Sequence, residues 1–293
     1  MALRGKAPDS VEKRLKALFY GPAGCGKTTA SIQFPSPYLI DTEKGAENDK
    51  YVKLLKAAGG VYFHTTDFDD LLKECTALLT EKHGYKTLII DPLTVIYNDM
   101  LDKSSKSLAT TDDPSGTAFG RHKGGPDRKI KHLINLLMRL DMNVIITSHS
   151  KTRWEKNGKE LVDAGQTYDC YAKLDYIFDL VIELQKRGPD RVGIIRKTRL
   201  ETFPEGEVIP FSYAEISKRY GKDVLERGAK AEVLATPEQV KELKRLIDLL
   251  KIEPATVDKW LDKAQAESIE EMPQYAAEAC LKMLESQLNP KGK

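Results

Sequence analysis

Nine consecutive residues near the start of the chain have the types and spacing needed to hold a phosphate. The first eight fit the pattern Gly-x-x-x-x-Gly-Lys-(Ser/Thr), and the nine are Gly21, Pro22, Ala23, Gly24, Cys25, Gly26, Lys27, Thr28 and Thr29. Glycines let the backbone wrap a phosphate with its N–H groups inward, and the following helix adds the positive end of its dipole. We expect Lys27 to reach the β- and γ-phosphates of ATP and the Thr28 hydroxyl to bind Mg²⁺. The alternative, a chance glycine-rich turn, is disfavoured because strand, loop and helix follow in order.

Two further strands are each predicted to end in carboxylates. Leu88, Ile89 and Ile90 lead into Asp91, which in a P-loop fold would lie beside the phosphates and hold the metal's water shell. A core strand that merely ends in Asp is the plainer alternative. The strand at 38–41 runs into Asp41 and Glu43, at the sheet edge where α/β proteins bind ligands. Glu43 could activate a water for attack on the γ-phosphate, with Asp41 as the second candidate.

The elements that must position these residues are those of an α/β protein. Short apolar runs at 15–20, 38–41, 61–64, 87–91 and 143–148 alternate with helical patterns at 27–34, 47–58, 68–82 and 128–140, as in a parallel sheet with crossover helices. Residues 177–184 and 192–197 flank a Gly188-Pro189 turn, which predicts a terminal antiparallel hairpin. We therefore expect a mostly parallel, mixed sheet within a core spanning 1–235.

Strand signals vanish after residue 235. Thr236, Pro237 and Gln239 have the order of a helix start with a capping box. Further helical patterns at 257–266 and 275–288 complete a predicted three-helix module at 236–293. Packing against the core and docking of a partner are both open roles for this module.

Composition excludes several classes of protein. The 293 residues carry 46 basic and 44 acidic side chains, a net of +2, so bulk charge selects no partner. The 41% hydrophobic and 31% charged fractions are those of a globular chain rather than a disordered one. No apolar run approaches the roughly 18 residues of a membrane span, and the first residues lack the apolar stretch of a leader. Four scattered cysteines indicate neither a disulfide framework nor a zinc site, so we expect a cytoplasmic protein without a membrane partner.

Two segments concentrate positive charge. Residues 121–131 hold five basic side chains against one carboxylate, and residues 150–159 hold four against one. We expect both to be loops, the first preceded by a mobile segment at 104–116. Cations that neutralise phosphates beside an aromatic that stacks on a base favour single-stranded nucleic acid, although solvated surface is the alternative. The expected contacts are Arg121, Lys123, Arg128, Lys151, Arg153, Trp154 and Lys156.

These motifs together resemble the RecA-like P-loop ATPases. Ile40-Asp41-Thr42-Glu43 is similar to the element of RecA and its relatives whose glutamate is the catalytic base, which implies that role for Glu43. Val144 to His149 resembles the strand that ends in a γ-phosphate sensor; His149 departs from the glutamine of RecA and looks more like the KaiC and DnaB branches and phage relatives. Lys197 and Arg199 are similar to the Lys-x-Arg element that reaches a neighbouring subunit's γ-phosphate. An exposed basic strand edge is the alternative for that pair.

Residues 12–215 look most like the phage-encoded ATP-binding proteins of the Sak type, which assist single-strand annealing in homologous recombination. The resemblance implies an ATP- and Mg²⁺-dependent ATPase that binds single-stranded DNA as a homo-oligomer, with partner docking as the role of the helical module. A single-strand binding protein is one such partner. Three other functions stay open at this point. They are a DnaB- or KaiC-like motor, a kinase of a small acceptor, and a nucleotide-gated adaptor.

Overall fold

The structure is a computed structural model that describes residues 13–158 and 160–288. Three parts of the predicted organisation lie outside the described residues: 1–12 of the core, Lys159 of the second basic segment, and 289–293 of the helical module. None of the helices formed by the described residues is long and apolar enough to cross a bilayer.

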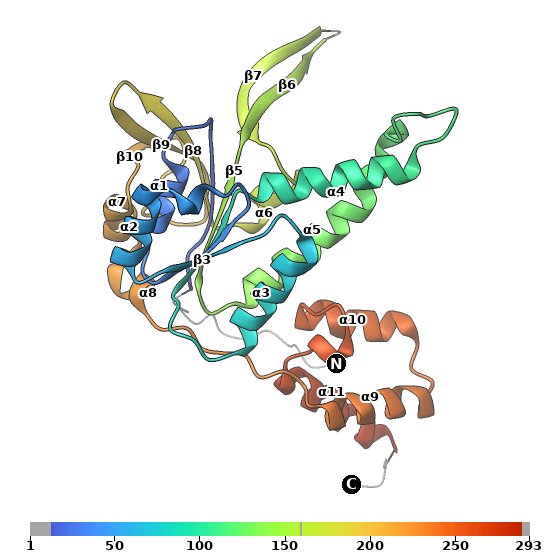
Figure 1. Cartoon of the computed structure of the whole chain (residues 1–293). Coiled ribbons are helices and arrows are strands. Elements are labelled where there is room, and N and C mark those ends of the chain that lie inside the picture. Colours follow the sequence, from blue (N-terminus) through green and yellow to red (C-terminus); the bar gives the residue numbers. More distant parts are fainter. Residues whose placement is uncertain (1–12, 159, 289–293) are drawn as a thin grey trace.

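A central sheet of eight strands organises the larger part of the molecule (Figure 1), in the order β10-β9-β8-β1-β5-β4-β2-β3. The strands from β8 to β3 are parallel, and β9 is antiparallel to both β8 and β10. This confirms the predicted mostly parallel sheet with an antiparallel hairpin. The strands are β1 (Lys16–Tyr20), β2 (Pro37–Asp41), β3 (Val61–His64), β4 (Thr87–Asp91), β5 (Asn143–Ser148), β8 (Leu180–Arg187), β9 (Asp190–Thr198) and β10 (Val208–Pro210).

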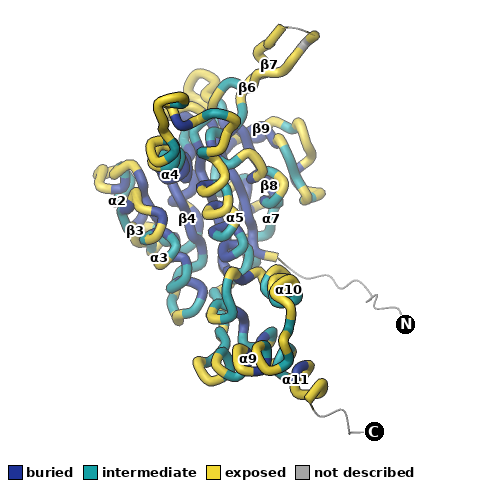
Figure 2. Tube along the Cα trace, turned by 90° about the vertical axis from the view of Figure 1, so that its right-hand side faces the viewer, coloured by how far each residue is buried: buried dark blue, intermediate teal, exposed yellow. Residues whose placement is uncertain are grey.

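Both faces of this sheet are buried, which explains why its inner strands are almost wholly apolar. Successive side chains of a strand point to opposite faces, so Leu18 and Ile90 join one apolar cluster while Phe19 and Ile89 join the other. Figure 2 shows the buried residues concentrated along the sheet. The first cluster packs against α3 (Phe68–Thr80), α4 (Leu93–Leu108), α5 (Gly124–Arg139) and α6 (Leu174–Ile177), and the second against α1 (Lys27–Ile32), α2 (Asp49–Ala58), α7 (Tyr213–Tyr220) and α8 (Lys222–Glu226).

Polar side chains fix where several elements begin and end. The Asp67 carboxylate accepts hydrogen bonds from the backbone N–H groups of Asp69 and Asp70 and so caps the start of α3. The buried ammonium group of Lys16 donates to the carbonyls of Leu137, Leu140 and Met142 at 2.8, 2.9 and 3.0 Å. Because those carbonyls close the end of α5, this contact joins the helix end to β1.

The C-terminal helices α9 (Pro237–Leu249), α10 (Pro254–Ala264) and α11 (Gln274–Leu288) form their own small apolar clusters. The predicted capping box at Thr236 and Gln239 is confirmed. The middle helix begins three residues earlier than predicted, because Pro254 occupies its first turn. Arg139 of α5 reaches this region through Glu232 at 2.5 Å and the Glu271 carbonyl at 2.9 Å.

The first basic segment is not the predicted loop. Helix α4 was not predicted, and it includes residues 104–108 of the segment expected to be mobile. A 3-10 helix at Ala118–Lys123 follows, and α5 begins at Gly124 rather than at 128. Helix α4 buries side chains only up to Met100, so its second half lacks the apolar stripe by which a helix is predicted.

The second basic segment is also not a loop. It forms β6 (Ser150–Asn157), which pairs with β7 (Glu160–Tyr168) in a separate antiparallel hairpin that projects from the molecule (Figure 1). Strand β8 likewise begins at Leu180 rather than at 177, because Ile177 belongs to α6. The β6–β7 hairpin was not predicted because most of its residues are exposed. Its strands therefore lack the alternation of apolar and polar residues by which a half-buried strand is predicted.

Candidate active site

The predicted P-loop joins β1 to α1. Gly24 and Gly26 have φ values of 73° and 98°, in the left-handed region that glycine adopts at little cost. A side chain at Gly26 would also meet Arg191, whose Cγ lies 3.5 Å from the position of an added Cβ. The Lys27 ammonium group donates to the carbonyls of Gly21 and Pro22 at 2.8 and 3.1 Å, which holds it inside the curve of the loop.

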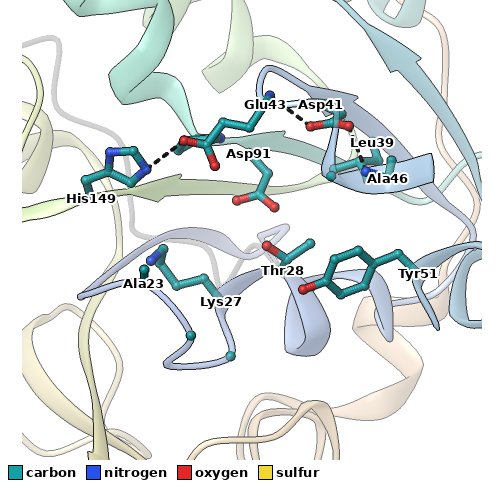
Figure 3. Close-up of a pocket in the computed structure, with 14 residues that line it drawn as sticks. Ala23, Lys27, Thr28, Leu39, Asp41, Glu43, Ala46, Tyr51, Asp91 and His149 are labelled. Carbon is teal, nitrogen blue, oxygen red and sulfur yellow. Dashed lines mark hydrogen bonds and ion pairs between the residues drawn. The ribbon is translucent and has the colours of Figure 1, made fainter. Parts of the chain in front are cut away.

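A cavity of about 240 Å³ opens between this loop and the neighbouring strand ends (Figure 3). Its walls come from four elements that follow parallel strands, as expected for the carboxyl edge of such a sheet. The lining residues are Ala23, Gly24, Gly26, Lys27, Thr28, Leu39, Asp41, Glu43, Gly45, Ala46, Tyr51, Asp91, Pro92 and His149.

Asp91 lies on the floor of the cavity at the end of β4, with 8% of its surface exposed. Burial raises the pKa of its carboxyl group, and hydrogen bonds from the hydroxyl groups of Thr147 and Thr28 and the charge of Lys27 oppose that rise. A buried carboxylate beside a threonine hydroxyl offers the oxygen ligands that Mg²⁺ prefers. The donor set therefore fits Mg²⁺, with Thr28 and Asp91 as the residues that would hold it.

Asp41 and Glu43 have different surroundings despite lying two residues apart. The buried Asp41 carboxylate accepts hydrogen bonds from the backbone N–H groups of Glu43 at 3.0 Å and Ala46 at 2.8 Å. Both of its oxygens are thereby engaged in shaping the turn after β2. The Glu43 carboxylate is half exposed and faces the cavity (Figure 3). The geometry favours Glu43 over Asp41 as a group that could accept a proton, and makes Asp41 a positioning residue.

His149, at the end of β5, is a partner of Glu43. Its Nε2 lies 3.0 Å from Glu43 Oε1, and its backbone N–H donates to the Thr94 hydroxyl at 3.0 Å. The Thr94 hydroxyl also lies 2.9 Å from the Ser148 hydroxyl. These contacts fix the tip of β5 against the start of α4, so the imidazole is held between β5 and the carboxylate of Glu43.

Lys197 and Arg199 lie away from this cavity. The Arg199 backbone N–H donates to the Asp179 carbonyl, and the Asp179 N–H donates to the carbonyl of Lys16. Arg199 is therefore level with the first residue of β1, five residues or about 16 Å of strand from the P-loop. Its guanidinium contacts the carbonyl of Ile177 at 3.1 Å and the Asp179 carboxylate at 3.3 Å, and Lys197 donates to the carbonyl of Phe178. Both side chains are therefore engaged by residues 177–179 rather than by the P-loop of their own chain.

The predicted nucleic-acid contacts divide between two projections of the molecule (Figure 1). Arg121 and Lys123 lie on the 3-10 helix between α4 and α5, and Arg128 lies in the first turns of α5. Lys151, Arg153, Trp154 and Lys156 lie on β6.

Exposed ion pairs engage several of these cations. Lys151 pairs with Asp169 at 3.0 Å and Arg153 with Glu155 at 3.0 Å. The Trp154 side chain is 60% exposed. The sequence thus placed these residues on the surface but did not reveal the two elements that carry them.

Sequence reasoning missed several residues at or next to the site, of which three bear on its chemistry. Tyr51 on α2 lines the cavity, Thr147 donates to Asp91, and Arg191 of β9 lies across the P-loop at Gly26. Thr147 had a weak signal, since it begins the polar end of an otherwise apolar strand. Tyr51 and Arg191 had none, because their nearness to the P-loop depends on how α2 and the β8–β9 hairpin pack.

A P-loop after the first strand of a mostly parallel sheet, a buried aspartate ending a second strand and a glutamate just past a third define a P-loop ATPase. Residues 13–208 match the family described as an AAA domain, and the chain belongs to that family.

Similar solved structures include the crystal structure of the RadB recombinase. The identity is 17% and the TM-score 0.44, with 74% of this chain and 90% of that chain covered. A prototypical ATPase from the type III secretion system of pathogenic bacteria is similar at 13% identity and a TM-score of 0.40, with 97% of this chain and 90% of that one covered. Among curated proteins, none matches the chain significantly.

Proposed function

We propose that this chain is an ATP- and Mg²⁺-dependent ATPase that binds single-stranded DNA in the cytoplasm during homologous recombination or single-strand annealing, as the resemblance to Sak-type proteins implies. One observation carries the proposal. Strand β5 ends at Ser148, the next residue, His149, lines the cavity, and Ser150 after it begins the basic hairpin β6–β7. A movement of His149 would therefore be passed directly to a candidate DNA-binding element.

The residues of the cavity have distinct roles in this proposal. Lys27 and the inward N–H groups of the P-loop bind the phosphates, while Thr28 and Asp91 hold the metal ion. Mg²⁺, when bound, neutralises charge on the phosphates. Glu43 accepts the proton of the attacking water, and Asp41 keeps Glu43 in place through the backbone of the turn. His149 positions the Glu43 carboxylate and exchanges that contact for one with the γ-phosphate.

The two projections supply the DNA contacts. Their cations are exposed, and the hairpin adds the exposed ring of Trp154. Single-stranded DNA offers unpaired bases for stacking as well as phosphates, so this combination suits it better than a duplex, whose bases are already stacked.

The proposal includes a homo-oligomer, which the position of Lys197 and Arg199 supports. Arg199 lies level with the first residue of β1, and both side chains contact carbonyls of residues 176–178, so we expect the pair to act on the γ-phosphate of a neighbouring subunit rather than on that of its own chain. Mixing tests this arrangement. Lys197→Ala should lose turnover by roughly 10³-fold, as residues supplied in trans do, and added Lys27→Ala subunits, inactive alone, should restore part of it by donating an intact Lys197. No restoration at any mixing ratio would contradict action in trans.

The coupling of ATP to DNA is tested by steady-state turnover of the full chain with and without a single-stranded oligonucleotide. We expect stimulation by single strands and weaker stimulation by a duplex of the same length. If DNA did not change the rate of ATP turnover and the oligonucleotide did not bind at low salt, the proposed DNA binding would be wrong.

Removal of α9–α11 tests the proposed docking of a single-strand binding protein, since it should abolish that contact and leave turnover intact.

A further inference from the structure

The ring of Phe119 is the most exposed large apolar side chain among the described residues. It is 101% exposed, whereas Trp154 is 60% exposed. Its backbone is also unusual, with φ 54° and ψ 18°, at a non-helical kink between two short 3-10 turns. A left-handed conformation is unfavourable for a residue with a Cβ, and exposure forgoes the burial that a phenyl ring normally gains. The left-handed backbone and the exposed ring each cost free energy, and no contact within the fold offsets either cost. We therefore expect Phe119 to contact another molecule.

The segment before Phe119 is ordered by its own hydrogen bonds. The Asp113 carboxylate accepts from the backbone N–H of Ala118 at 2.9 Å and from the hydroxyl group of Ser115 at 2.8 Å. Gly116 packs so closely on α4 that an added Cβ would lie 1.9 Å from the Ser105 carbonyl oxygen. The hydrogen-bonded turn at residues 113–118 thus holds the Phe119 ring outward.

The surroundings of Phe119 indicate what it contacts. Arg121 and Lys123 follow it, and both side chains are exposed. An added Cβ at Gly120 or Gly124 would meet no other atoms within 4 Å, so the segment that follows the ring is open to solvent at both positions. A protein partner would favour further apolar side chains around the phenyl group, but the residues that follow it are glycines, a histidine and cations, of which Arg121 also lies 3.9 Å from the Asp113 carboxylate. An aromatic face flanked by cations matches an unpaired base with its phosphates.

We propose that Phe119 stacks on an unpaired base of single-stranded nucleic acid while Arg121 and Lys123 contact the flanking phosphates. This inference rests on the proposed function and deepens it, because it assigns base contacts to the tip between α4 and α5 in addition to Trp154 on the β6–β7 hairpin. Stacking does not depend on base identity, so the site accepts any sequence.

The experiment measures binding of the full chain to a fluorescent single-stranded oligonucleotide by anisotropy at low salt. Removal of one stacked base contact should weaken binding of Phe119→Ala by roughly 5- to 100-fold. Phe119→Trp should retain wild-type affinity. Tyr275→Ala is the matched control, since Tyr275 is a 70% exposed aromatic residue on the C-terminal helix α11 and should have no effect. The fold should tolerate all three variants, and thermal melting checks this.

An abasic oligonucleotide of the same length isolates the stacking contact. It presents the phosphates without bases, so wild type and Phe119→Ala should bind it equally. Equal affinity of the two proteins for the normal oligonucleotide would overturn the stacking contact while leaving the proposed function standing. A changed sedimentation coefficient with unchanged affinity would overturn it in favour of a contact between proteins. Failure of the wild type to bind any oligonucleotide would instead remove DNA from the proposed function, and the stacking contact with it.

Discussion

The two buried aspartates of the cavity and the cations of the two projections are held in opposite ways. In the cavity, both oxygens of Asp41 accept backbone N–H groups, and Asp91 is buried with a hydroxyl partner. On the projections, Lys151 and Arg153 form ion pairs in which each partner retains much of its exposure. Fixed charges suit a reaction that requires precise positions, whereas exposed pairs contribute little to stability and exchange easily for a phosphate. The comparison predicts large, specific effects of mutations in the cavity and small, salt-dependent effects on the projections.

The largest effect is expected for Glu43→Gln. Loss of the general base should lower kcat for ATP by roughly 10²- to 10⁴-fold, with ATP affinity nearly unchanged because glutamine preserves the shape. Phosphate release measures this. Glu47→Gln is the matched control, since Glu47 is exposed four residues further on and does not line the cavity. A comparable loss in both variants would show that the effect is not specific to Glu43.

Lys27→Ala should lower the affinity for ATP. Its ammonium group lies within the curve of the P-loop, and hydrogen bonds to charged groups contribute about 1.5–3 kcal/mol each, so ATP affinity should fall by roughly 10- to 100-fold. Calorimetric titration of ATP in the presence of Mg²⁺ measures the loss. Lys53→Ala, on the exposed side of α2, should bind ATP as the wild type does. Unchanged affinity of the Lys27 variant would mean that nucleotide binds elsewhere.

Asp91→Asn should raise the stability of the nucleotide-free protein and lower its ATPase activity. Burial raises the pKa of Asp91, so its ionised form destabilises the fold, and the free energy of unfolding should decline as the pH rises from the usual aspartate range through the raised pKa. The neutral amide should therefore stabilise the nucleotide-free protein by about 0.5–2 kcal/mol near neutral pH while lowering Mg²⁺-dependent turnover. Urea unfolding at several pH values measures the first effect. A less stable variant would indicate that Asp91 serves the fold.

The smallest effect is expected on the hairpin. Lys151→Gln breaks an exposed pair with Asp169, so stability should change by less than about 1 kcal/mol. Affinity for a single strand should fall a few-fold, and the slope of log affinity against log salt concentration should decrease by about 1. Anisotropy across a salt series gives both numbers. If the salt slope stayed the same, Lys151 would have no phosphate contact, and the contrast between cavity and projections would weaken.

The cavity was more accessible to sequence reasoning than the projections for a physical reason. The P-loop is a local motif, and parallel strands bring their carboxyl ends to one edge, so the nearness of Asp91 and Glu43 to Lys27 follows from topology. The contact between Glu43 and His149 depends on side-chain packing across three different strand ends, which no local pattern encodes.

The projections lack the apolar periodicity from which elements are predicted. The β6–β7 hairpin is exposed along most of its length, and the second half of α4 extends beyond the core. Charged residues there resemble a loop because burial, rather than chain conformation, produces the periodic signal. The exposure of Phe119 likewise depends on a turn held by Asp113, which the composition of the segment did not reveal.

The most direct test of the account follows labelled ATP on the purified full chain in a single turnover with Mg²⁺. The account predicts that the wild type retains ATP and converts it to ADP and phosphate, and that Glu43→Gln retains the same amount of ATP but leaves it intact. Failure of the wild type to retain ATP, or conversion by Glu43→Gln at the wild-type rate, would contradict the assignment of this cavity as the site of hydrolysis.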